Sequence, residues 1–434
     1  MTSILIKNGT IIDPSNARNL ERVADVFIKE GIIAKIGANL DRPSADTVID
    51  AKGKIVTAGL VDMHVHLREP GREDKETIRT ATQAAAKGGV TSILGMPNTN
   101  PRIDNQTAVK FVLERGRQEG VVNVFTSGNI SQRGEGKEMA EMWEMKNEGV
   151  KVFTDDGDDI QDLGLYRKVL QYARTHDLTI MSHAENHDLK HGVCMHEGKI
   201  STELGLPAAP ASTETSHVAK ILAILREVPT PFHFTHMSSG EALKLIQQAK
   251  QDGLPVTCDV TPHHLVLNEE AYLGYDTQAK VCPPLRSEED RQMLVEMVMN
   301  GTVDAIATDH APHTLVDKYV EFENAAVGMV GLETLFPLMY TKLVKDWKVI
   351  DLPRLIELLT SQPAAIMREE IGTLRVGDPA DITVWDTKKK YKIDKDSFAS
   401  KGRNTPFHGW DVYGQAVETI VNGERVLAQG RLSC

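Results

Sequence analysis

Histidine and aspartate side chains stand at the ends of four apolar runs of this sequence. His64 and His66 follow the first run, and His183, His236 and Asp309 end three later ones. Imidazole nitrogens and carboxylate oxygens bind zinc in proteins. Residues two apart on a strand point to the same side, so His64 and His66 can reach one ion. A single such histidine is more often a hydrogen-bonded structural residue, but five at corresponding places predict a metal site.

A site with two ions also requires an oxygen ligand that both ions share. The stretch Lys151-Val152-Phe153-Thr154-Asp155-Asp156-Gly157 supplies candidates at the end of another short apolar run. They are Asp155, Asp156 and a modified Lys151, and spacing alone does not choose between them. The Asp-Gly pair is also typical of an ordinary turn.

The middle of the chain alternates strand-like and helix-like segments. Helical patterns at 73–87, 164–175, 240–250 and 288–300 each precede an apolar, strand-like run. Such repeats predict an α/β fold, and we expect a (β/α)8 TIM-like barrel over residues 55–370. A doubly wound sheet is the alternative. The barrel is favoured because the polar residues follow each apolar run, and the carboxyl ends of barrel strands meet at one face.

Both ends of the chain read as β-structure. Residues 1–54 and 371–434 carry short strand-like runs separated by turn signals, among them Asn422-Gly423 in a predicted hairpin. Neither end is long enough for a core of its own. We therefore expect the two ends to pair into one small β-sandwich domain.

Composition excludes several classes of function. The 434 residues carry a net charge of −12, which argues against binding to nucleic acid or to an anionic membrane surface. No apolar run is long enough to span a bilayer, and we expect no signal peptide. The cysteines, Cys194, Cys258, Cys282 and Cys434, are far apart and suggest free thiols in a reducing cytoplasm.

Several motifs together make the resemblance specific. The sequence resembles the dihydroorotases of the amidohydrolase superfamily, in particular the long bacterial type. Matching stretches lie at 59–71, 95–99, 153–157, 182–185, 235–238, 260–265 and 307–313, and the match continues to 377–381. The His-x-His pair alone would indicate only the superfamily. Pro97-Asn98-Thr99 and Asp309-His310-Ala311-Pro312-His313 point to dihydroorotases within it.

The resemblance implies a role for each candidate residue. His64, His66 and Asp309 would bind a first zinc ion, His183 and His236 a second, and Asp156 would bridge them, which leaves Lys151 unmodified. Zinc lowers the pKa of a coordinated water to about 7 and so supplies hydroxide at neutral pH. Asp309 would move the proton to the leaving ring nitrogen. Arg68, Asn98 and His313 would hold the substrate carboxylate.

The implied reaction is the reversible interconversion of N-carbamoyl-L-aspartate and dihydroorotate in pyrimidine (UMP) biosynthesis. One alternative is another cyclic amide hydrolase: a hydantoinase, a dihydropyrimidinase or an allantoinase. Another is a weakly active partner subunit of aspartate transcarbamoylase; a homodimer is a further expectation. The sequence departs from the family at Cys282, where asparagine is usual, and at Ala325-Ala326-Val327-Gly328, where Pro-Phe-Gly is usual.

Overall fold

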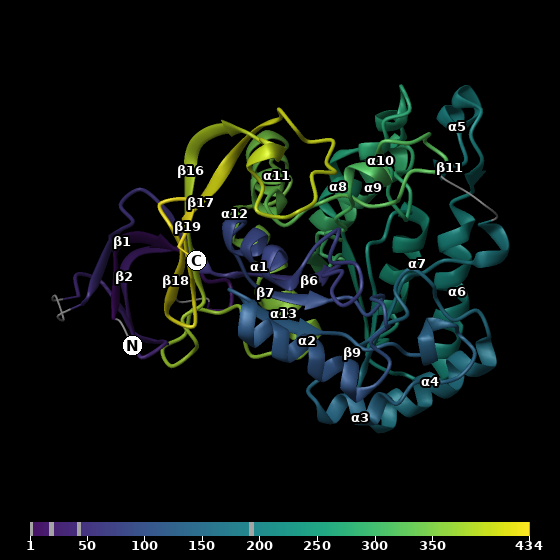
Figure 1. The fold of residues 1–434 in the computed structure, drawn as a ribbon, viewed down its shortest axis with the longest axis horizontal. Helices are drawn as coiled ribbons and strands as arrows, with labels where there is room; N and C mark the ends of the chain where they lie inside the picture. Colours follow the sequence, from purple (N-terminus) through teal and green to yellow (C-terminus); the bar gives the residue numbers. More distant parts are fainter. Residues whose placement is uncertain (1–2, 17–20, 41–44, 191–194, 434) are drawn as a thin grey trace.

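The computed structural model describes residues 3–16, 21–40, 45–190 and 195–433. Cys194, Cys434 and parts of the N-terminal segment 1–54 lie outside these ranges. The fold is α/β (Figure 1). Among the described residues, no helix combines the length and the apolar character needed to cross a membrane.

Parallel strands form the centre of the larger part of the molecule. Three of them pair in the order β6-β7-β8 and five in the order β15-β14-β13-β10-β9. Two parallel bridges connect the sets, Gly128 with Phe153 and Val65 with His310, so the pairing returns to its starting strand. The strands are β6 (Leu60–Val65), β7 (Val90–Gly95), β8 (Asn123–Thr126), β9 (Val152–Phe153), β10 (Thr179–Ser182), β13 (Phe232–Phe234), β14 (Val256–Val260) and β15 (Ala305–Ile306).

Apolar side chains fill the space that the parallel strands enclose. Val61, Met63, Leu94 and Met181 belong to one buried cluster together with residues of β9 and β15. Members two apart on one strand, such as Val61 and Met63, share this side because strand side chains alternate. The interior is therefore packed, and the polar residues of interest lie beyond the strand ends.

Helices alternate with these strands and surround them (Figure 1). Those predicted at 164–175, 240–250 and 288–300 are present within one residue of their expected bounds. The predicted helix at 73–87 begins later, at Ile78, because the Thr77 side chain caps it by accepting from the Thr80 amide. The helices are α1 (Ile78–Lys87), α2 (Gln106–Glu119), α3 (Met142–Asn147), α4 (Leu163–Thr175), α5 (Lys199–Leu204), α6 (Ser212–Glu227), α7 (Gly240–Gln251), α8 (Pro262–Val266), α9 (Glu288–Met299), α10 (Leu315–Lys318), α11 (Leu335–Met339), α12 (Leu352–Leu359) and α13 (Ser361–Met367).

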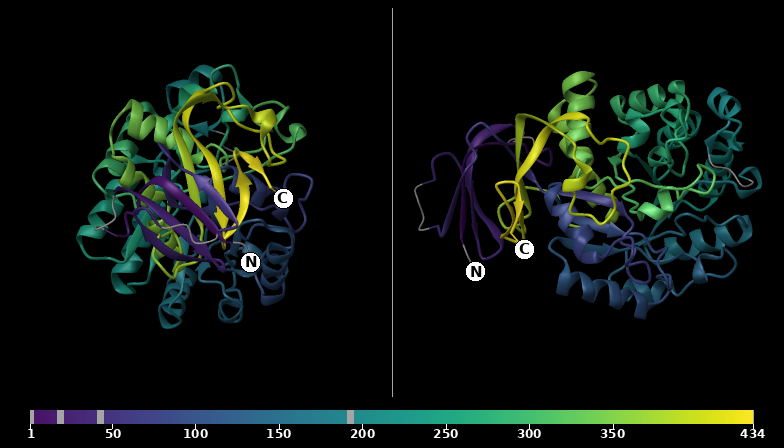
Figure 2. Two further views of the ribbon diagram at one scale, coloured as in Figure 1. Left: turned by 90° about the vertical axis from the view of Figure 1, so that its left-hand side faces the viewer. Right: turned by 45° about the horizontal axis from the view of Figure 1, so that its top comes forward.

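Strands from both ends of the chain share one mixed sheet. Figures 1 and 2 show the N-terminal strands, in purple, beside the C-terminal strands, in yellow, at one end of the molecule. The order is β19-β18-β17-β16-β5-β1-β2-β3, with β4 paired to β1. The strands are β1 (Ile4–Ile11), β2 (Arg22–Lys29), β3 (Ile32–Gly37), β4 (Thr47–Asp50), β5 (Ile55–Ala58), β16 (Ile382–Lys392), β17 (Asp411–Val421), β18 (Glu424–Ala428) and β19 (Arg431–Leu432).

The apolar run before His64 is two strands, where one was expected. Residues 55–58 form β5 in the mixed sheet, and residues 60–65 form β6 among the parallel strands. Gly59 lies between the two strands. A Cβ atom at this position would lie 2.1 Å from the Thr91 side chain, so a larger residue does not fit. The strand at 55–58 thus pairs outside the parallel set, although the predicted barrel segment begins at 55.

Asp381 ties the mixed sheet to the parallel strands. Its carboxylate accepts hydrogen bonds from the Asn123 side chain on β8 and from the Asn422 amide in the β17–β18 turn, both at 2.7 Å. Burial raises the pKa of Asp381 to about 6, although both hydrogen bonds oppose that shift. Its ionised form at neutral pH therefore costs stability.

The substitution Asp381→Asn should flatten the pH dependence of stability. Since the folded pKa of about 6 lies above the ordinary 3.8, the favourable contribution of Asp381 is complete below pH 4 and is lost as the pH rises through 6. The wild type should lose up to about 3 kcal/mol relative to the variant over that range. Urea unfolding of both proteins at pH 4.5, 5.5 and 7.5 measures this difference. The same difference in free energy of unfolding between the two proteins at all three pH values would contradict the prediction.

Candidate metal centre and active site

The five histidines and aspartates at strand ends come together in the structure. His64 lies on β6 and His66 directly after it, while His183, His236 and Asp309 follow β10, β13 and β15. All five are at least nine-tenths buried. The cyclic pairing of the strands brings these residues, up to 245 positions apart, to one end of the parallel strands.

Part of the site has a left-handed backbone. The φ angles of Arg68, His236 and Asp309 are 61°, 41° and 49°. Non-glycine residues rarely adopt this conformation, and such residues cluster at functional sites, where the surrounding structure must hold them. The structure around the site therefore holds these three residues in a backbone conformation that they would rarely adopt on their own.

The hydrogen bonds of His64 fix the proton on its ring. Its Nδ1 lies 2.8 Å from the Thr235 hydroxyl, which donates its own hydrogen to Asp259 at 2.9 Å. Thr235 must therefore accept from Nδ1–H of His64. Nε2 of His64 faces the cluster, 3.4 Å from Asp156 and 3.5 Å from Asp309, without a hydrogen-bond partner. Burial opposes protonation of the ring, but Asp156 and then Asp309 raise the pKa of His64 to about 9, so Nε2 carries a proton that a metal ion would replace.

His66 is oriented in the same way by Asn98. Its Nδ1 lies 3.0 Å from the Asn98 side-chain oxygen, which can only accept. Its Nε2 lies 3.0 Å from Asp309 and 3.6 Å from Asp156. The Asn98 amide nitrogen also donates to Asp156 at 3.3 Å. In this structure Asn98 thus contacts two candidate ligands, whereas the sequence placed it at the substrate.

His183 and His236 form the other half of the cluster around Asp156. The Asp156 Oδ1 lies 3.5 Å from Nε2 of His236 and 3.8 Å from Nδ1 of His183. On its far side, Nε2 of His183 faces the Glu185 carboxylate at 3.4 Å. A carboxylate behind a metal-binding imidazole holds its orientation and raises its basicity.

These residues fit a pair of metal ions. His64, His66 and Asp309 form one set whose ligand atoms lie within 4.8 Å of one another, and His64, Asp156 and His236 form another. The buried atoms Nε2 of His64 and Oδ1 of Asp156 have no hydrogen-bond partner, which is costly unless a cation binds there. Burial opposes ionisation of Asp156, yet the neighbouring imidazoles, His64 first, hold its pKa well below 3.8.

The structure separates the three candidates for the shared oxygen ligand. Asp155 accepts from the Asn129 side chain and from the amides of Ile130 and Ser131, so it orders the neighbouring loop. Lys151 donates to the Arg368 carbonyl and pairs with Glu369, both at 2.9 Å, at the opposite end of β9 from Asp156. Of the three, Asp156 is the one that contacts the histidines.

Arg68 and His313 lie side by side next to the cluster. Nε of Arg68 donates to the Pro312 carbonyl at 3.2 Å, and its Nη2 lies 3.3 Å from Nε2 of His313. Burial lowers the pKa of Arg68 to about 10, so its guanidinium is cationic at neutral pH. Arg68 forms no ion pair with Asp62 or Glu69, two acidic residues close to it in the sequence that the structure describes.

Hydrogen bonds also fix the proton on His313. Lys75 Nζ, which can only donate, lies 3.0 Å from Nδ1 of His313. Nε2 therefore carries the hydrogen and donates to the Val327 carbonyl at 2.8 Å. Burial, Arg68, Lys75 and Lys318 together lower the pKa of His313 to about 2, so the ring is neutral.

Cys282 lies at the edge of the cluster, near its second half. Its Sγ is 3.9 Å from Nε2 of His183 and 3.6 Å from Nζ of Lys190, which also pairs with Glu185. The Cys282 thiol, with the Lys190 ammonium beside it, thus stands at the position where the resemblance would place an asparagine.

Sequence reasoning missed Lys75, Thr235 and Glu185 as residues with a specific task. Each holds a histidine through the nitrogen that faces away from the candidate metal centre or substrate. Thr235 lies within the motif at 235–238, directly before His236, and Glu185 lies within the motif at 182–185, two residues after His183. Lys75 gave no signal, because lysine is ordinarily a surface residue.

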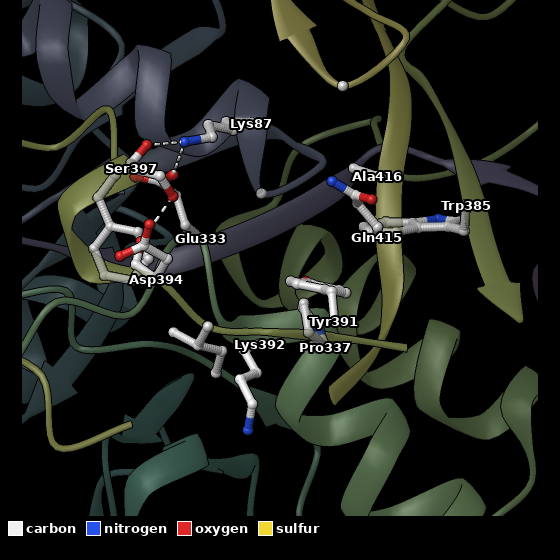
Figure 3. Close-up of a pocket in the computed structure, with 14 residues that line it drawn as sticks. Lys87, Glu333, Pro337, Trp385, Tyr391, Lys392, Asp394, Ser397, Gln415 and Ala416 are labelled. Carbon is white, nitrogen blue, oxygen red and sulfur yellow. Dashed lines mark hydrogen bonds and ion pairs between the residues drawn. The ribbon is translucent and has the colours of Figure 1, made fainter. Parts of the chain in front are cut away.

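The cavity drawn in Figure 3 is a different place. It has a volume of about 130 Å³ and lies between the end of α1 and the C-terminal strands. Figure 3 shows the Lys87 ammonium between Glu333 and the Ser397 carbonyl, with Trp385 and Gln415 on the far wall. None of the candidate ligands lines this cavity.

Sequence comparison decides the family. A protein from Pelotomaculum thermopropionicum named "Dihydroorotase" is 46% identical over 429 residues and covers 99% of both chains. Another of that name, from Syntrophus aciditrophicus, is 45% identical over 98% of this chain and 99% of its own. The chain belongs to the dihydroorotase family. The profile described as "Dihydro-orotase-like" matches residues 53–242, which include four of the five strand-end residues and Asp156. The protein is thus a metal-dependent cyclic amide hydrolase.

Solved structures with the same fold come from related enzymes. An L-hydantoinase (dihydropyrimidinase) from Arthrobacter aurescens superimposes with a TM-score of 0.89 at 26% identity, covering 100% of this chain and 98% of its own. A D-hydantoinase has a TM-score of 0.87 at 24% identity, covering 99% and 96%, and indicates the fold alone. The fold is thus common to several cyclic amide hydrolases, whereas the sequence matches dihydroorotases.

Replacing Asp156 and Lys151 in turn should separate their roles. Asp156→Ala removes the carboxylate that contacts four imidazoles, so the purified variant should lose at least half of its bound metal. Lys151→Met should keep the wild-type metal content, because Lys151 contacts Arg368 and Glu369 instead. Elemental analysis after gel filtration measures both, and metal loss in Lys151→Met would revive a modified lysine as ligand.

Proposed function

We propose that this protein catalyses the reversible interconversion of N-carbamoyl-L-aspartate and (S)-dihydroorotate, a step of pyrimidine biosynthesis. The observation that carries the proposal is near full-length identity of 41–46% to several proteins named dihydroorotase. The chemistry of the site supports it, since a histidine and aspartate cluster adjoins a cationic arginine. A cyclic amide with a carboxylate substituent matches both features.

The metal ligands in this proposal are His64, His66 and Asp309 for one zinc ion and His183 and His236 for a second, with Asp156 shared. Nitrogen and oxygen ligands of this kind suit zinc. When bound, zinc supplies a hydroxide nucleophile at neutral pH and polarises the amide carbonyl. Three imidazoles are oriented for this task by Thr235, Asn98 and Glu185.

Asp309 is the proposed proton carrier. Burial opposes its ionisation, but His66, His64 and His236 hold its pKa far below 3.8, so Asp309 is a carboxylate at neutral pH. One oxygen contacts both His64 and His66, which holds the group at the centre. In ring opening, Asp309 takes the proton of the attacking hydroxide and gives it to the leaving ring nitrogen. Ring closure uses the same transfers in reverse.

Arg68 and His313 are the proposed binding residues for the substrate carboxylate. The guanidinium offers two parallel N–H donors and the neutral imidazole offers Nε2–H, which now donates to Val327. Asn98, the third candidate, already binds His66 and Asp156. One hydrogen of the Asn98 amide group donates to Asp156, and the second hydrogen remains available to donate to a substrate.

The architecture in this proposal is a (β/α)8 TIM-like barrel over residues 55–370 with a small β-sandwich domain from residues 1–54 and 371–434. The returning order of the parallel strands and the shared mixed sheet support it. We also propose a cytoplasmic enzyme that forms a homodimer or associates with aspartate transcarbamoylase. The free thiols of Cys258 and Cys282 are in keeping with a reducing compartment.

Substrate comparison tests the activity itself. The purified protein with zinc should turn over dihydroorotate with a kcat/KM at least about 100-fold above that for hydantoin, dihydrouracil and allantoin, which lack the carboxylate that Arg68 would bind. Removal of the metal with a chelator should abolish turnover, and zinc should restore it. Preference for hydantoin or allantoin would assign the chain to another cyclic amide hydrolase.

Asp309→Ala should lower kcat for ring opening by about 10³-fold or more while leaving the fold intact, because a metal ligand and the proton carrier are lost together. Asp304→Ala is the matched control. Asp304 lies on the other side of the short strand β15, where it pairs with Lys250, and its loss should leave turnover within about threefold. Wild-type turnover in Asp309→Ala would remove Asp309 from this role.

A further inference from the structure

We propose that two buried lysines, Lys280 and Lys318, are positioning residues that set the carboxylate-binding pair Arg68 and His313. This inference rests on the proposed function, because it concerns how that site holds its substrate. Their ammonium groups donate to backbone carbonyls of the surrounding loops. They act through the loop 325–328, at which the sequence departs from its family.

Both ammonium groups are buried and surrounded by backbone carbonyls. Lys318 Nζ donates to the carbonyls of Thr277, Lys280 and Ala326 at 2.9, 3.2 and 2.7 Å. Lys280 Nζ donates to the carbonyls of Phe322, Glu323 and Ala325 at 2.7, 2.9 and 2.8 Å. The two side chains are 2% and 3% exposed. Each ammonium thus has three acceptors for its three hydrogens, which is the condition for burying a lysine.

These contacts hold the loop on both sides of Val327. Lys280 binds the carbonyl of Ala325 and Lys318 that of Ala326, while the Gly328 amide donates to the Lys280 carbonyl at 2.9 Å. The Val327 carbonyl between them accepts from Nε2 of His313. The position of His313 therefore depends on where the two lysines hold the loop.

A second connection leads from α10 to the same histidine. Asp317 precedes Lys318 and pairs with Lys75 at 3.1 Å, and Lys75 donates to Nδ1 of His313. One short helix thus fixes both ring nitrogens of His313, through Lys75 on one side and through Val327 on the other. Arg68, 3.3 Å from Nε2 of His313, is held against the same ring.

Apolar packing contributes little to α10 itself. Leu315, Val316 and Tyr319, in α10 and directly after it, expose 76%, 79% and 94% of their surface. The inner side of α10 is held by the hydrogen bonds of Lys318 to the carbonyls of Thr277, Lys280 and Ala326.

Charge is the second consequence of this arrangement. The chain carries a net charge of −12, yet Arg68 and Lys75 both contact the His313 imidazole, and Lys318 lies near enough to lower its pKa. Burial, with Lys280 next, lowers the pKa of Lys318 to about 7. Cations crowded in this way favour an anionic substrate at the site.

Steady-state kinetics of Lys318→Met and Lys280→Met, assembled with zinc, test the proposal. Each should raise KM for dihydroorotate about tenfold or more, with kcat within about threefold and the metal content unchanged. Lys250→Met is the matched control. Its ammonium also donates to a backbone carbonyl, that of Thr302, but far from His313, and its loss should leave KM unchanged.

The result separates this inference from the proposed function. Absence of dihydroorotate turnover in the wild type would refute the function, whereas unchanged KM in both lysine variants would refute the positioning role alone. Loss of kcat and metal together with KM would show a merely structural role and would equally overturn the proposal. If Lys318→Met does not fold, Lys318→Gln, which keeps two N–H donors, should show a smaller rise in KM of the same kind.

Discussion

The candidate metal centre depends on what three of its four imidazoles do with the outward-facing nitrogen. A histidine binds a metal ion through a lone pair, and the lone pair is available where the other nitrogen carries the hydrogen. Here Thr235 accepts that hydrogen from His64 and Asn98 accepts it from His66, while the Glu185 carboxylate lies 3.4 Å from the outward-facing nitrogen of His183. Each acceptor follows a strand end itself. The closed order of the parallel strands therefore supplies both the ligands and the groups that orient them.

Negative charge is the second requirement of the centre. Asp156 and Asp309 are buried carboxylates, which burial alone would protonate, and the surrounding imidazoles keep both ionised. This balance requires a dense packing of partners around each acid. Asp156 lies among the imidazoles, whereas Asp155, one residue away, is bound by the 129–131 loop. One step along the chain turns a side chain to a different set of neighbours.

The proposed substrate-binding side of the site also fixes a histidine through both ring nitrogens, but its neighbours are cations instead of carboxylates. His313 is kept neutral by nearby cations and is held at both nitrogens, so it can only donate from Nε2. Arg68 provides the charge, and the lysines around α10 hold the loop that contacts His313. The metal side is anchored by strand ends, whereas this side is anchored by a loop whose outer surface is exposed.

The sequence by itself determined the ligand types and most of the elements that carry them. The spacing of His64 and His66, and the polar ends of successive apolar runs, follow from local periodicity, which is written in neighbouring residues. Tertiary structure decided what local periodicity cannot express. It divided the run 55–65 between two sheets at Gly59. Thr91, on another strand, leaves no room there for a side chain larger than that of glycine. It also brought Asp156, and not Lys151, into contact with the histidines, and it buried Lys75, Lys280 and Lys318. Those outcomes depend on which distant carbonyls and carboxylates surround a side chain after folding, and no pattern within the chain records them.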